Sequence, residues 1–424
     1  MMGMSIDHEP RIQELYSKLT VDYLKECAEN DKIDEWNAQY LEYLHLASGF
    51  YKNRNYPSLE EQKEDSSFKF SDDMIDLESK NMAWIKRPNF NYADFSGLNL
   101  KNVMLRMADL EFVTFSDSTL QNAKFAGANL KYAKFIREQL SDVDFTYAEL
   151  VSALFSSVTL DEVNFSWANL TSARFVKFQA KKLFFSGTNL LKISGNEVTI
   201  QDAFFIWANL NKANLEEAVI TNSRLVQVNL LEANLHKADL TESTFAYAEL
   251  LDTNFIKANL TKTNFHYSEV NGSTIFEGII IDENTDFTGV GLSNIRISPI
   301  DKVRLEKNIR KKHWEEWYTT HIVLSYPARL FWWLSDYGSS CKRCLLSFVG
   351  LIVLAFIVNF VLTQSTSPDI AELFANTVLA LFGVGDPGLE GTARLWQVVY
   401  VISGYFLLAV LISRFAIMFQ NMSP

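Results

Sequence analysis

Apolar side chains recur at every fifth position from residue 90 to residue 280. The series starts at Phe90 and Phe95 and stays in phase to Ile275 and Ile280. Of its 39 members, 32 are Leu or Phe, and Gly195 alone lacks an apolar side chain. A period of five fits neither the helical period of about 3.6 residues nor the strand period of about 2. It predicts a chain that turns a corner every five residues and points one Leu or Phe inward in each unit.

The residues around each inward position are also regular. The chain favours a small residue two positions before it and Asn or Asp one position before it, as in Ala128-Asn129-Leu130 and Ala208-Asn209-Leu210. This pattern resembles the pentapeptide-repeat family, whose fold is a right-handed quadrilateral β-helix with four units per coil. The resemblance implies a mainly β solenoid over residues 88–290, in which each coil hydrogen-bonds to the next.

Phe and Leu alternate at the inward positions from Phe115 to Leu190. On a four-sided coil this alternation places Phe on two opposite faces, so we expect stacked aromatic columns and a packed interior without a ligand channel. The pattern is disturbed where inward positions are charged, large or small: Glu138, Phe178, Ala180, Leu183 and Gly195. We expect a local bulge at these positions rather than a binding site.

Residues 1–87 are predicted to form a helical region followed by a linker. Apolar residues at helical spacing indicate two amphipathic helices within residues 10–50, separated by the polar sequence Glu29-Asn30-Asp31. These helices either cap the end of the solenoid, which is a rod of stacked coils, or bind a partner. Residues 57–80 are rich in Glu, Asp and Ser, which is typical of a linker. A cytosolic protein partner is therefore expected to bind through residues 1–80 or through the solenoid.

Residues 291–340 are predicted to form a basic helical linker and an interfacial helix. Residues 301–322 combine Lys and Arg with Trp314 and Trp317, and residues 326–337 are short and aromatic. Such segments favour contact with lipid headgroups or with other subunits at the membrane surface. Cys341 and Cys344 form a lone CxxC pair. Zinc needs four ligands, so this pair is interpreted as two structural or lipidated thiols, and no metal or cofactor is expected.

Residues 341–424 are predicted to form an α-helical two-span membrane domain. The segments 344–363 and 395–413 carry no charge and are each long enough to cross about 30 Å of hydrocarbon. Between them, residues 367–387 begin with helix-start residues, continue with about three apolar turns and stop at two glycines. This middle segment is too short to span, which favours a re-entrant half-helix.

The order of helix, half-helix, Gly-x-Gly-Asp and helix resembles the two-transmembrane pore module of the potassium-channel superfamily. There, backbone carbonyls of the filter replace the water around the ion. By this resemblance the selectivity filter comprises six residues: Leu381, Phe382, Gly383, Val384, Gly385 and Asp386. Leu381 and Val384 stand where the family has Thr and Tyr, so potassium selectivity does not follow. The resemblance implies a homotetramer that conducts monovalent cations. Gly404 in the second span is either a gating hinge or a close-packing contact.

The charges beside the spans predict the orientation of the chain. Lys342 and Arg343 precede the first span and Arg414 follows the second, which places both termini and the solenoid in the cytosol. The first twenty residues carry acids and no apolar run, so no cleavable signal is expected. We therefore expect a protein of the bacterial inner membrane, in contact with membrane lipids.

Composition and missing motifs exclude several functions. The 424 residues carry a net charge of −12, which disfavours nucleic-acid binding. No histidine pair at metal spacing and no Gly-x-Ser-x-Gly sequence supports an enzyme. Two functions remain open: an ion channel whose cytosolic rod senses or docks a partner, and a membrane-anchored interaction protein without a pore. The second would resemble acidic pentapeptide-repeat proteins that mimic DNA and inhibit type II topoisomerases.

Overall fold

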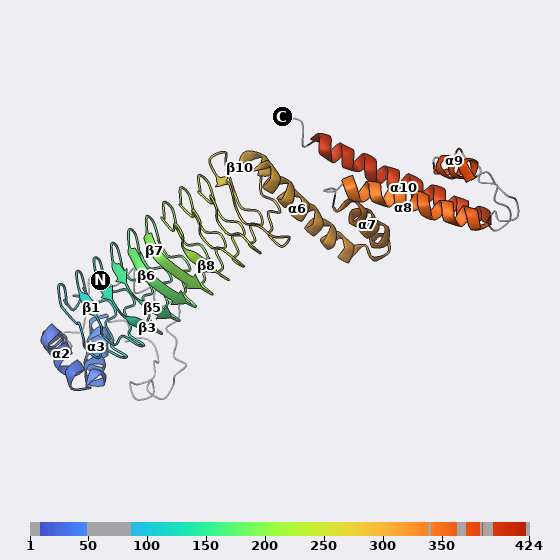
Figure 1. Cartoon of the computed structure of the whole chain (residues 1–424). Coiled ribbons are helices and arrows are strands. Elements are labelled where there is room, and N and C mark those ends of the chain that lie inside the picture. Colours follow the sequence, from blue (N-terminus) through green and yellow to red (C-terminus); the bar gives the residue numbers. More distant parts are fainter. Residues whose placement is uncertain are drawn as a thin grey trace, which may run out of the picture. The chain divides into compact units, whose positions relative to one another are not determined.

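The computed structural model describes residues 9–48, 86–337, 341–362, 370–381, 384 and 393–420. The chain divides into two compact units, Met1–Asp301 and Lys302–Pro424. The first unit contains three N-terminal helices and a β-solenoid, and the second contains helices (Figure 1). Each unit is described separately below.

Among the described residues, three helices precede the solenoid: α1 (Glu9–Lys18), α2 (Val21–Glu29) and α3 (Ile33–Ser48). The prediction of two helices was wrong in this respect, because the first predicted helix is divided at Thr20. The backbone N–H of Tyr23 donates a hydrogen bond of 3.2 Å to Oγ1 of Thr20. Thr20 therefore acts as an N-cap that starts a new helix, although the apolar spacing continues across it.

Helix α3 caps the N-terminal end of the solenoid (Figure 1). The buried Trp36 donates from Nε1 to the carbonyl of Met104 at 3.0 Å, and its ring lies 5.8 Å from that of Phe90. The hydroxyl of Tyr40 donates to the carbonyl of Arg106 at 2.8 Å. These contacts cover carbonyls and a core ring that the first coil would otherwise expose. Of the two alternatives for this region, the structure shows the cap.

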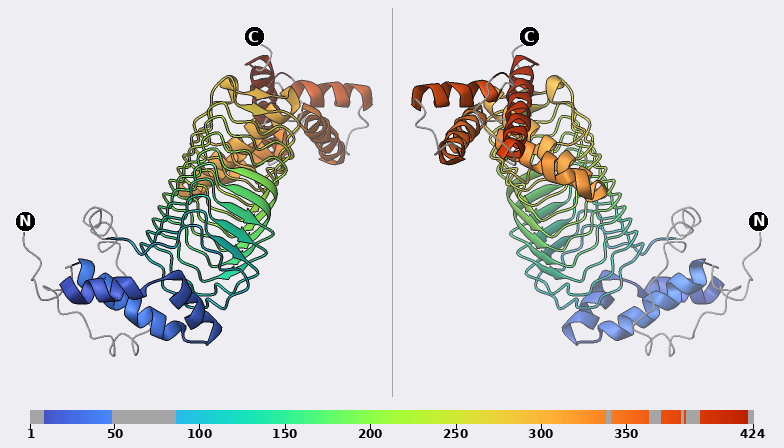
Figure 2. Two further views of the ribbon diagram at one scale, coloured as in Figure 1. Left: turned by 90° about the vertical axis from the view of Figure 1, so that its left-hand side faces the viewer. Right: turned by 90° about the vertical axis from the view of Figure 1, so that its right-hand side faces the viewer.

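The solenoid rises by one coil every twenty residues, through parallel backbone pairing (Figure 2). Left-handed φ angles between 50° and 64° recur every five residues, for example at Tyr147, Ser152, Ser157 and Glu162, so each coil has four corners. Longer pairings are strands: β1 (Thr114–Ser116), β2 (Lys134–Ile136), β3 (Gln139–Ser141), β4 (Leu154–Ser156), β5 (Thr159–Asp161), β6 (Arg174–Lys181), β7 (Ser194–Gln201), β8 (Val219–Thr221), β9 (Ile275–Phe276) and β10 (Arg296–Ile297).

An Asn before an inward residue shows one way in which non-glycine residues hold these corners. Oδ1 of Asn209 accepts from the backbone N–H of Asn211 at 3.1 Å, next to the left-handed corner at Lys212. Nδ2 of Asn209 donates to Oδ1 of Asn189 one coil earlier, also at 3.1 Å. Asn209 therefore stabilises its own turn and the neighbouring coil, which offsets the cost of the left-handed backbone.

Stacked Phe columns fill the interior, as predicted. Phe125, Phe145 and Phe165 are fully buried, with ring centroids 5.2 Å and 5.0 Å apart along one column. A second column contains Phe135 and Phe155, and rings of the two columns meet edge to face, as Phe145 and Phe155 do at 89°. Such offset and T-shaped pairs are the favoured aromatic geometries. The interior is therefore a packed core.

The disturbed segment contains two long paired strands and no bulge, which corrects the expectation. Strands β6 and β7 pair over Phe175↔Gly195, Phe178↔Val198 and Ala180↔Ile200, each with the usual offset of twenty. A Cβ on Gly195 would lie 2.7 Å from Cγ2 of Val198. Phe178 and Val198 thus fill the interior space that small residues at the usual inward positions leave open.

The period of five ends earlier than the sequence indicated. Asn254 pairs with Ile275, 21 residues on, and Asn264 pairs with Asp286, 22 residues on, so one residue is inserted in each of the last two coils. Phe276 and Phe287 are the fully buried residues there. Ile280 is 57% exposed, so the assignment of Ile275 and Ile280 as inward residues was wrong. After the 3₁₀ helix η3 (Leu292–Asn294), β10 pairs with β9 and closes the last coil.

The remaining helices are α6 (Pro299–Thr320), α7 (Ile322–Ser335), α8 (Cys341–Leu362), α9 (Ile370–Ala380) and α10 (Ala393–Gln420). Within the second unit α6 packs against α7 through Trp314 and Trp332, whose ring centroids are 5.4 Å apart. Helix α9 packs beside α8 and α10. The unit therefore contains helices where the sequence predicted a basic helix, a short aromatic helix and apolar helices.

Candidate functional site

The predicted filter lies at the C-terminal end of α9, and the structure describes two of its six residues. Leu381 is buried and follows directly after α9. Val384 is 75% exposed, and its N–H donates to the carbonyl of Leu379 at 3.1 Å. The other four lie outside the described residues: Phe382, Gly383, Gly385 and Asp386. The filter assignment therefore stays a prediction.

Gly404 forms a close-packing contact in α10. A Cβ on Gly404 would lie 2.4 Å from Cδ2 of Leu381 and 2.9 Å from its carbonyl oxygen. Only glycine allows the backbone of α10 to approach the end of α9 this closely. Of the two alternatives for Gly404, the structure favours packing, and this packing positions the residue where the predicted filter begins.

A buried polar network joins α8, α9 and α10 next to this contact. Nδ2 of Asn359 donates to Oγ1 of Thr377 at 3.1 Å, and that hydroxyl donates to the carbonyl of Leu373 at 2.8 Å. The hydroxyl of Tyr400 donates to the carbonyl of Thr377 at 3.0 Å. Helices α8, α9 and α10 are thus linked through the side chain and the backbone carbonyl of Thr377. Sequence reasoning did not identify this network, and its only signal was polar residues inside apolar helices.

The apolar stretches of α8 and α10 differ in length. Leu395–Ser413 in α10 is a run of 19 residues that is long and apolar enough to cross a bilayer, and it is the single such run among the described residues. The apolar part of α8, Leu345–Val361, is 17 residues and the helix α9 is shorter still. The structure therefore contains one candidate span, and the prediction of two spans is not established.

Charged and aromatic side chains gather where α7 ends. Asp336, the C-cap of α7, pairs with Nζ of Lys307 at 2.8 Å and with Nη1 of Arg343 at 3.2 Å. Nε of Arg310 donates to the carbonyl of Tyr337 at 2.9 Å. Helices α6 and α8 are thereby held at the same end of α7. Cys341 and Cys344 lie in the first turn of α8, and the described residues contain no group of three or more His, Cys, Asp or Glu that could hold a metal ion.

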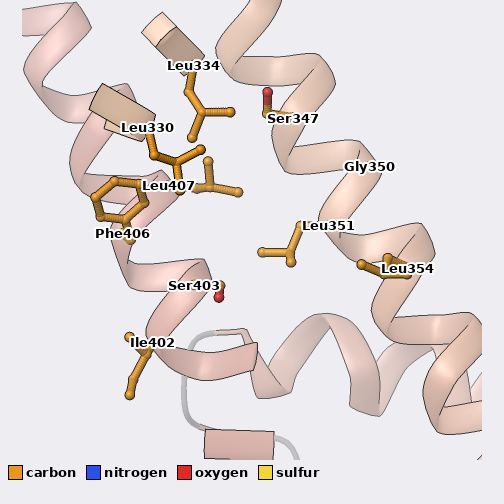
Figure 3. A pocket seen from close by; sticks show the side chains of 10 residues that line it. All are labelled: Leu330, Leu334, Ser347, Gly350, Leu351, Leu354, Ile402, Ser403, Phe406 and Leu407. Atoms are coloured by element: carbon orange, nitrogen blue, oxygen red, sulfur yellow. The ribbon is translucent and has the colours of Figure 1, made fainter. Parts of the chain in front are cut away.

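The helices α7, α8 and α10 enclose an apolar groove of about 450 Å³ (Figure 3). Its lining comes from all three helices: Leu330, Leu334, Ser347, Gly350, Leu351, Leu354, Ile402, Ser403, Phe406 and Leu407. Leu351 of α8 and Leu407 of α10 point toward one another across it (Figure 3). Sequence reasoning did not predict this groove, because it exists only once α7 packs across the other two helices.

One corner of the solenoid carries aromatic side chains on five coils, of which four are exposed and Tyr147 is half-buried. We call them the aromatic column: Tyr147, Trp167, Trp207, Tyr247 and Tyr267. Gly187 interrupts the column, and the ring of Trp167 occupies the space next to it. A Cβ on Gly187 would lie 2.4 Å from this ring. Nε1 of Trp207 donates to Oε1 of Gln227 at 2.8 Å. The column was visible in the sequence only as a spacing of twenty residues.

Comparison with known proteins agrees with the repeat pattern. The model of the family described as pentapeptide repeats matches residues 108–137, 139–175, 208–245 and 238–274. No curated protein sequence is significantly similar to this chain.

Two solved structures are similar to about half of this chain. One is HetL, a pentapeptide repeat protein involved in heterocyst differentiation regulation from the cyanobacterium Nostoc sp. strain PCC 7120. It is 19% identical, the match covers 54% of this chain and 95% of HetL, and the TM-score is 0.22. The other is full-length QnrB1, a plasmid-mediated fluoroquinolone resistance protein. It is 18% identical, the match covers 51% of this chain and 99% of QnrB1, and the TM-score is 0.26.

The five-residue period, the twenty-residue coils with four left-handed corners and the family match agree over one segment of the chain. The solenoid of this protein is a pentapeptide-repeat domain.

Proposed function

We propose that this chain is the subunit of an integral-membrane ion channel, in which α8 and α10 cross the bilayer and α9 enters it part-way. The observation that carries the proposal is α9. Its 11 residues measure about 16 Å, half of the hydrocarbon thickness of about 30 Å, and it buries Leu373, Thr377 and Ala380. In lipid, polar groups must find partners within the protein, and Nδ2 of Asn359 and the hydroxyls of Thr377 and Tyr400 each donate a hydrogen bond within these helices. This is the arrangement that a re-entrant helix requires.

The position of Leu381 supports the same proposal. Because Gly404 holds Leu381 at the end of α9, residues 382–386 start from a fixed point between two apolar helices. Glycines at 383 and 385 permit backbone angles that align carbonyls toward an axis. Backbone of this kind is tolerated at membrane depth only around a shared, wet axis, so several copies must assemble. By resemblance to the potassium-channel superfamily the assembly is a homotetramer that passes monovalent cations.

We further propose that the cytosolic rod docks a protein partner through the aromatic column. Residues 9–48 already cap the rod, so the column is the better candidate surface. Trp167 and Trp207 are 51% and 59% exposed, and exposed Trp and Tyr are the residues that most often dominate protein interfaces. The basic residues at the start of α8 support a location of this rod on the cytosolic side of a bacterial inner membrane.

Planar-bilayer recording of the purified full chain tests the channel. The expected result is unitary cation currents that disappear in Gly385→Ala, because Ala does not readily adopt the positive φ of a filter glycine. Gly388→Ala, in the same segment but outside the motif, should keep the currents. A silent wild-type protein with intact oligomers in several lipids, at both voltage polarities, would refute the channel.

A membrane-anchored interaction protein without a pore is the second candidate. It is favoured by the single run long enough to span among the described residues. A DNA mimic is a less suitable version of this interaction protein, because acidic side chains on the solenoid form ion pairs with basic side chains one coil away. Such pairs include Glu162–Lys182, Glu217–Lys237 and Glu242–Lys262, at 2.6–2.7 Å. In this case the protein would fractionate with membranes and pass no ions.

A further inference from the structure

The groove between α7, α8 and α10 is lined almost entirely by apolar side chains. Its two hydroxyls are engaged within their own helices: Oγ of Ser347 donates to the carbonyl of Arg343 and Oγ of Ser403 to that of Val399, each at 2.8 Å. Gly350 contributes no side chain, and a Cβ there would meet no atom within 4 Å. The groove therefore suits an apolar ligand and has open space along α8.

The size of the groove suits a small ligand. The groove measures about 450 Å³, which lies within the range of pockets that bind small ligands. An extended hydrocarbon chain is a ligand of this kind.

One end of the groove is cationic. Ser347 lies one turn from Arg343, and Leu334 lies two residues before Asp336. Lys307, Arg310 and Arg343 converge there, opposed by the carboxylates of Asp336 and Glu306. Residues 301–343 carry nine basic and five acidic side chains in all. This excess of positive charge favours an anionic headgroup at this end.

Helix α7 also presents an apolar stripe that continues into the groove. Ile322, Tyr326, Leu330 and Trp333 are all exposed and fall on one helical face. Leu330 belongs to both the stripe and the groove lining. An amphipathic helix with Tyr and Trp on its apolar face lies in the membrane interface, where a lipid chain can enter the groove.

We propose that the groove binds one acyl chain of an anionic membrane phospholipid, with the phosphate held at the Arg343 end. The inference rests on the proposed membrane location of this unit, and it is independent of the pore. In this proposal α7 forms part of a lipid site, and the bound lipid connects α7 to α8 and α10.

Native mass spectrometry of the full chain in detergent tests the site, with phosphatidylglycerol and phosphatidylcholine as probes. Gly350→Phe should fill the groove without a clash and weaken phosphatidylglycerol binding at least tenfold. The control is Val349→Phe, at an exposed neighbouring position outside the lining, which should bind the lipid like the wild type. Arg343→Gln should remove most of the preference for phosphatidylglycerol over phosphatidylcholine, whereas Lys342→Gln should change it less than twofold.

Equal lipid retention by Gly350→Phe and Val349→Phe would overturn the site. So would a disulfide between two copies formed efficiently by Leu351→Cys, since that would show a second chain in the groove. Membrane fractionation separates this failure from that of the proposed function. If the chain resists alkaline extraction from membranes but gives one of these two results, the lipid site is refuted and the membrane location stands. If alkaline wash releases the chain, the membrane location itself is refuted.

Discussion

In the solenoid, side chains pack against residues twenty positions away, whereas in the helical unit the spacing of partners follows no rule. Phe145 stacks on Phe165, and Glu162 pairs with Lys182. In the helical unit, by contrast, Asn359 bonds to Thr377 across 18 positions and Lys307 to Asp336 across 29. A repeating contact is encoded many times, so its spacing can be recognised in the sequence. A unique contact is encoded once, so its loss is not compensated elsewhere.

Phe135→Asp should produce the largest effect, because it places a carboxylate in the packed interior. Phe135 is fully buried and stacks on Phe115 at 5.2 Å and Phe155 at 4.8 Å. Loss of a buried Phe costs about 3–5 kcal/mol, and burial of the charge adds to this. Thermal unfolding of the full chain in detergent, followed by circular dichroism, should show loss of the β signal below the wild-type transition. Gln139→Asp adds the same charge at an exposed site and should shift stability by less than about 0.5 kcal/mol. Similar losses for both would contradict the inward register.

Gly404→Ala tests whether the helical unit depends on one unique contact. A Cβ there meets the backbone oxygen of Leu381 at 2.9 Å, so the helices must separate. We expect a loss of about 1–3 kcal/mol in the free energy of unfolding, measured in mixed detergent micelles. Gly350→Ala, where a Cβ has free space, should be neutral or slightly stabilising. A gating hinge would behave differently, since Gly404→Ala would then change channel opening without lowering stability.

Thr377→Val should weaken the same unit by a smaller amount. The change keeps the side-chain volume but removes the acceptor of Asn359 and the donor to Leu373. Hydrogen bonds between membrane helices are worth about 0.6–2 kcal/mol, so we expect a loss of about 1–2 kcal/mol in the same micelle assay. Ser403→Ala removes a bond that stays within α10 and should cost less than half as much. If both variants unfold like the wild type, the network does not hold the three helices together.

Glu138→Gln should give the smallest effect and should depend on pH. Burial raises the pKa of the Glu138 carboxyl, although the backbone N–H and the hydroxyl of Ser118 donate to it and oppose the shift. The folded chain therefore holds this proton more tightly than the unfolded chain. The stability that Glu138 contributes falls as the pH rises from about 4.3 through the raised pKa. Gln removes this loss, so the variant should be more stable than the wild type at pH 8, by less than the losses expected of the other variants, and equal to it near pH 4. Glu162→Gln, at an exposed ion pair, should show no such gain. A difference between Glu138→Gln and wild type that does not change with pH would contradict a buried, charged carboxylate.

Much of the solenoid could be predicted because its contacts repeat. The inward Leu and Phe and the Phe columns follow from one spacing. The prediction failed where the sequence allowed either of two neighbouring residues to face inward. Ile275 and Phe276 are both apolar, and only the pairing with residues 254 and 255 decides that Phe276 faces inward. Likewise, a swap of large and small residues at Phe178 and Ala180 resembles a bulge until the strand register is known.

The candidate site was less predictable. Its segment was located by apolar length and by two glycines, but Asn359, Thr377 and Tyr400 were not connected, because no period links three helices. The same limit applies to Gly404, whose two alternatives differ only in what lies opposite it. The groove depends on how α7 crosses two other helices, which local sequence does not specify.

The sequence by itself thus determined the five-residue period, the identity of most core residues and the order of apolar and charged helices, because these depend on contacts within one repeat or one helix. Only the tertiary structure decided where the phase shifts, that α3 caps the rod, that Gly404 packs on Leu381, and that three helices share one polar network and one groove. These features depend on contacts between distant residues whose spacing has no period, so each of them had to be seen in three dimensions.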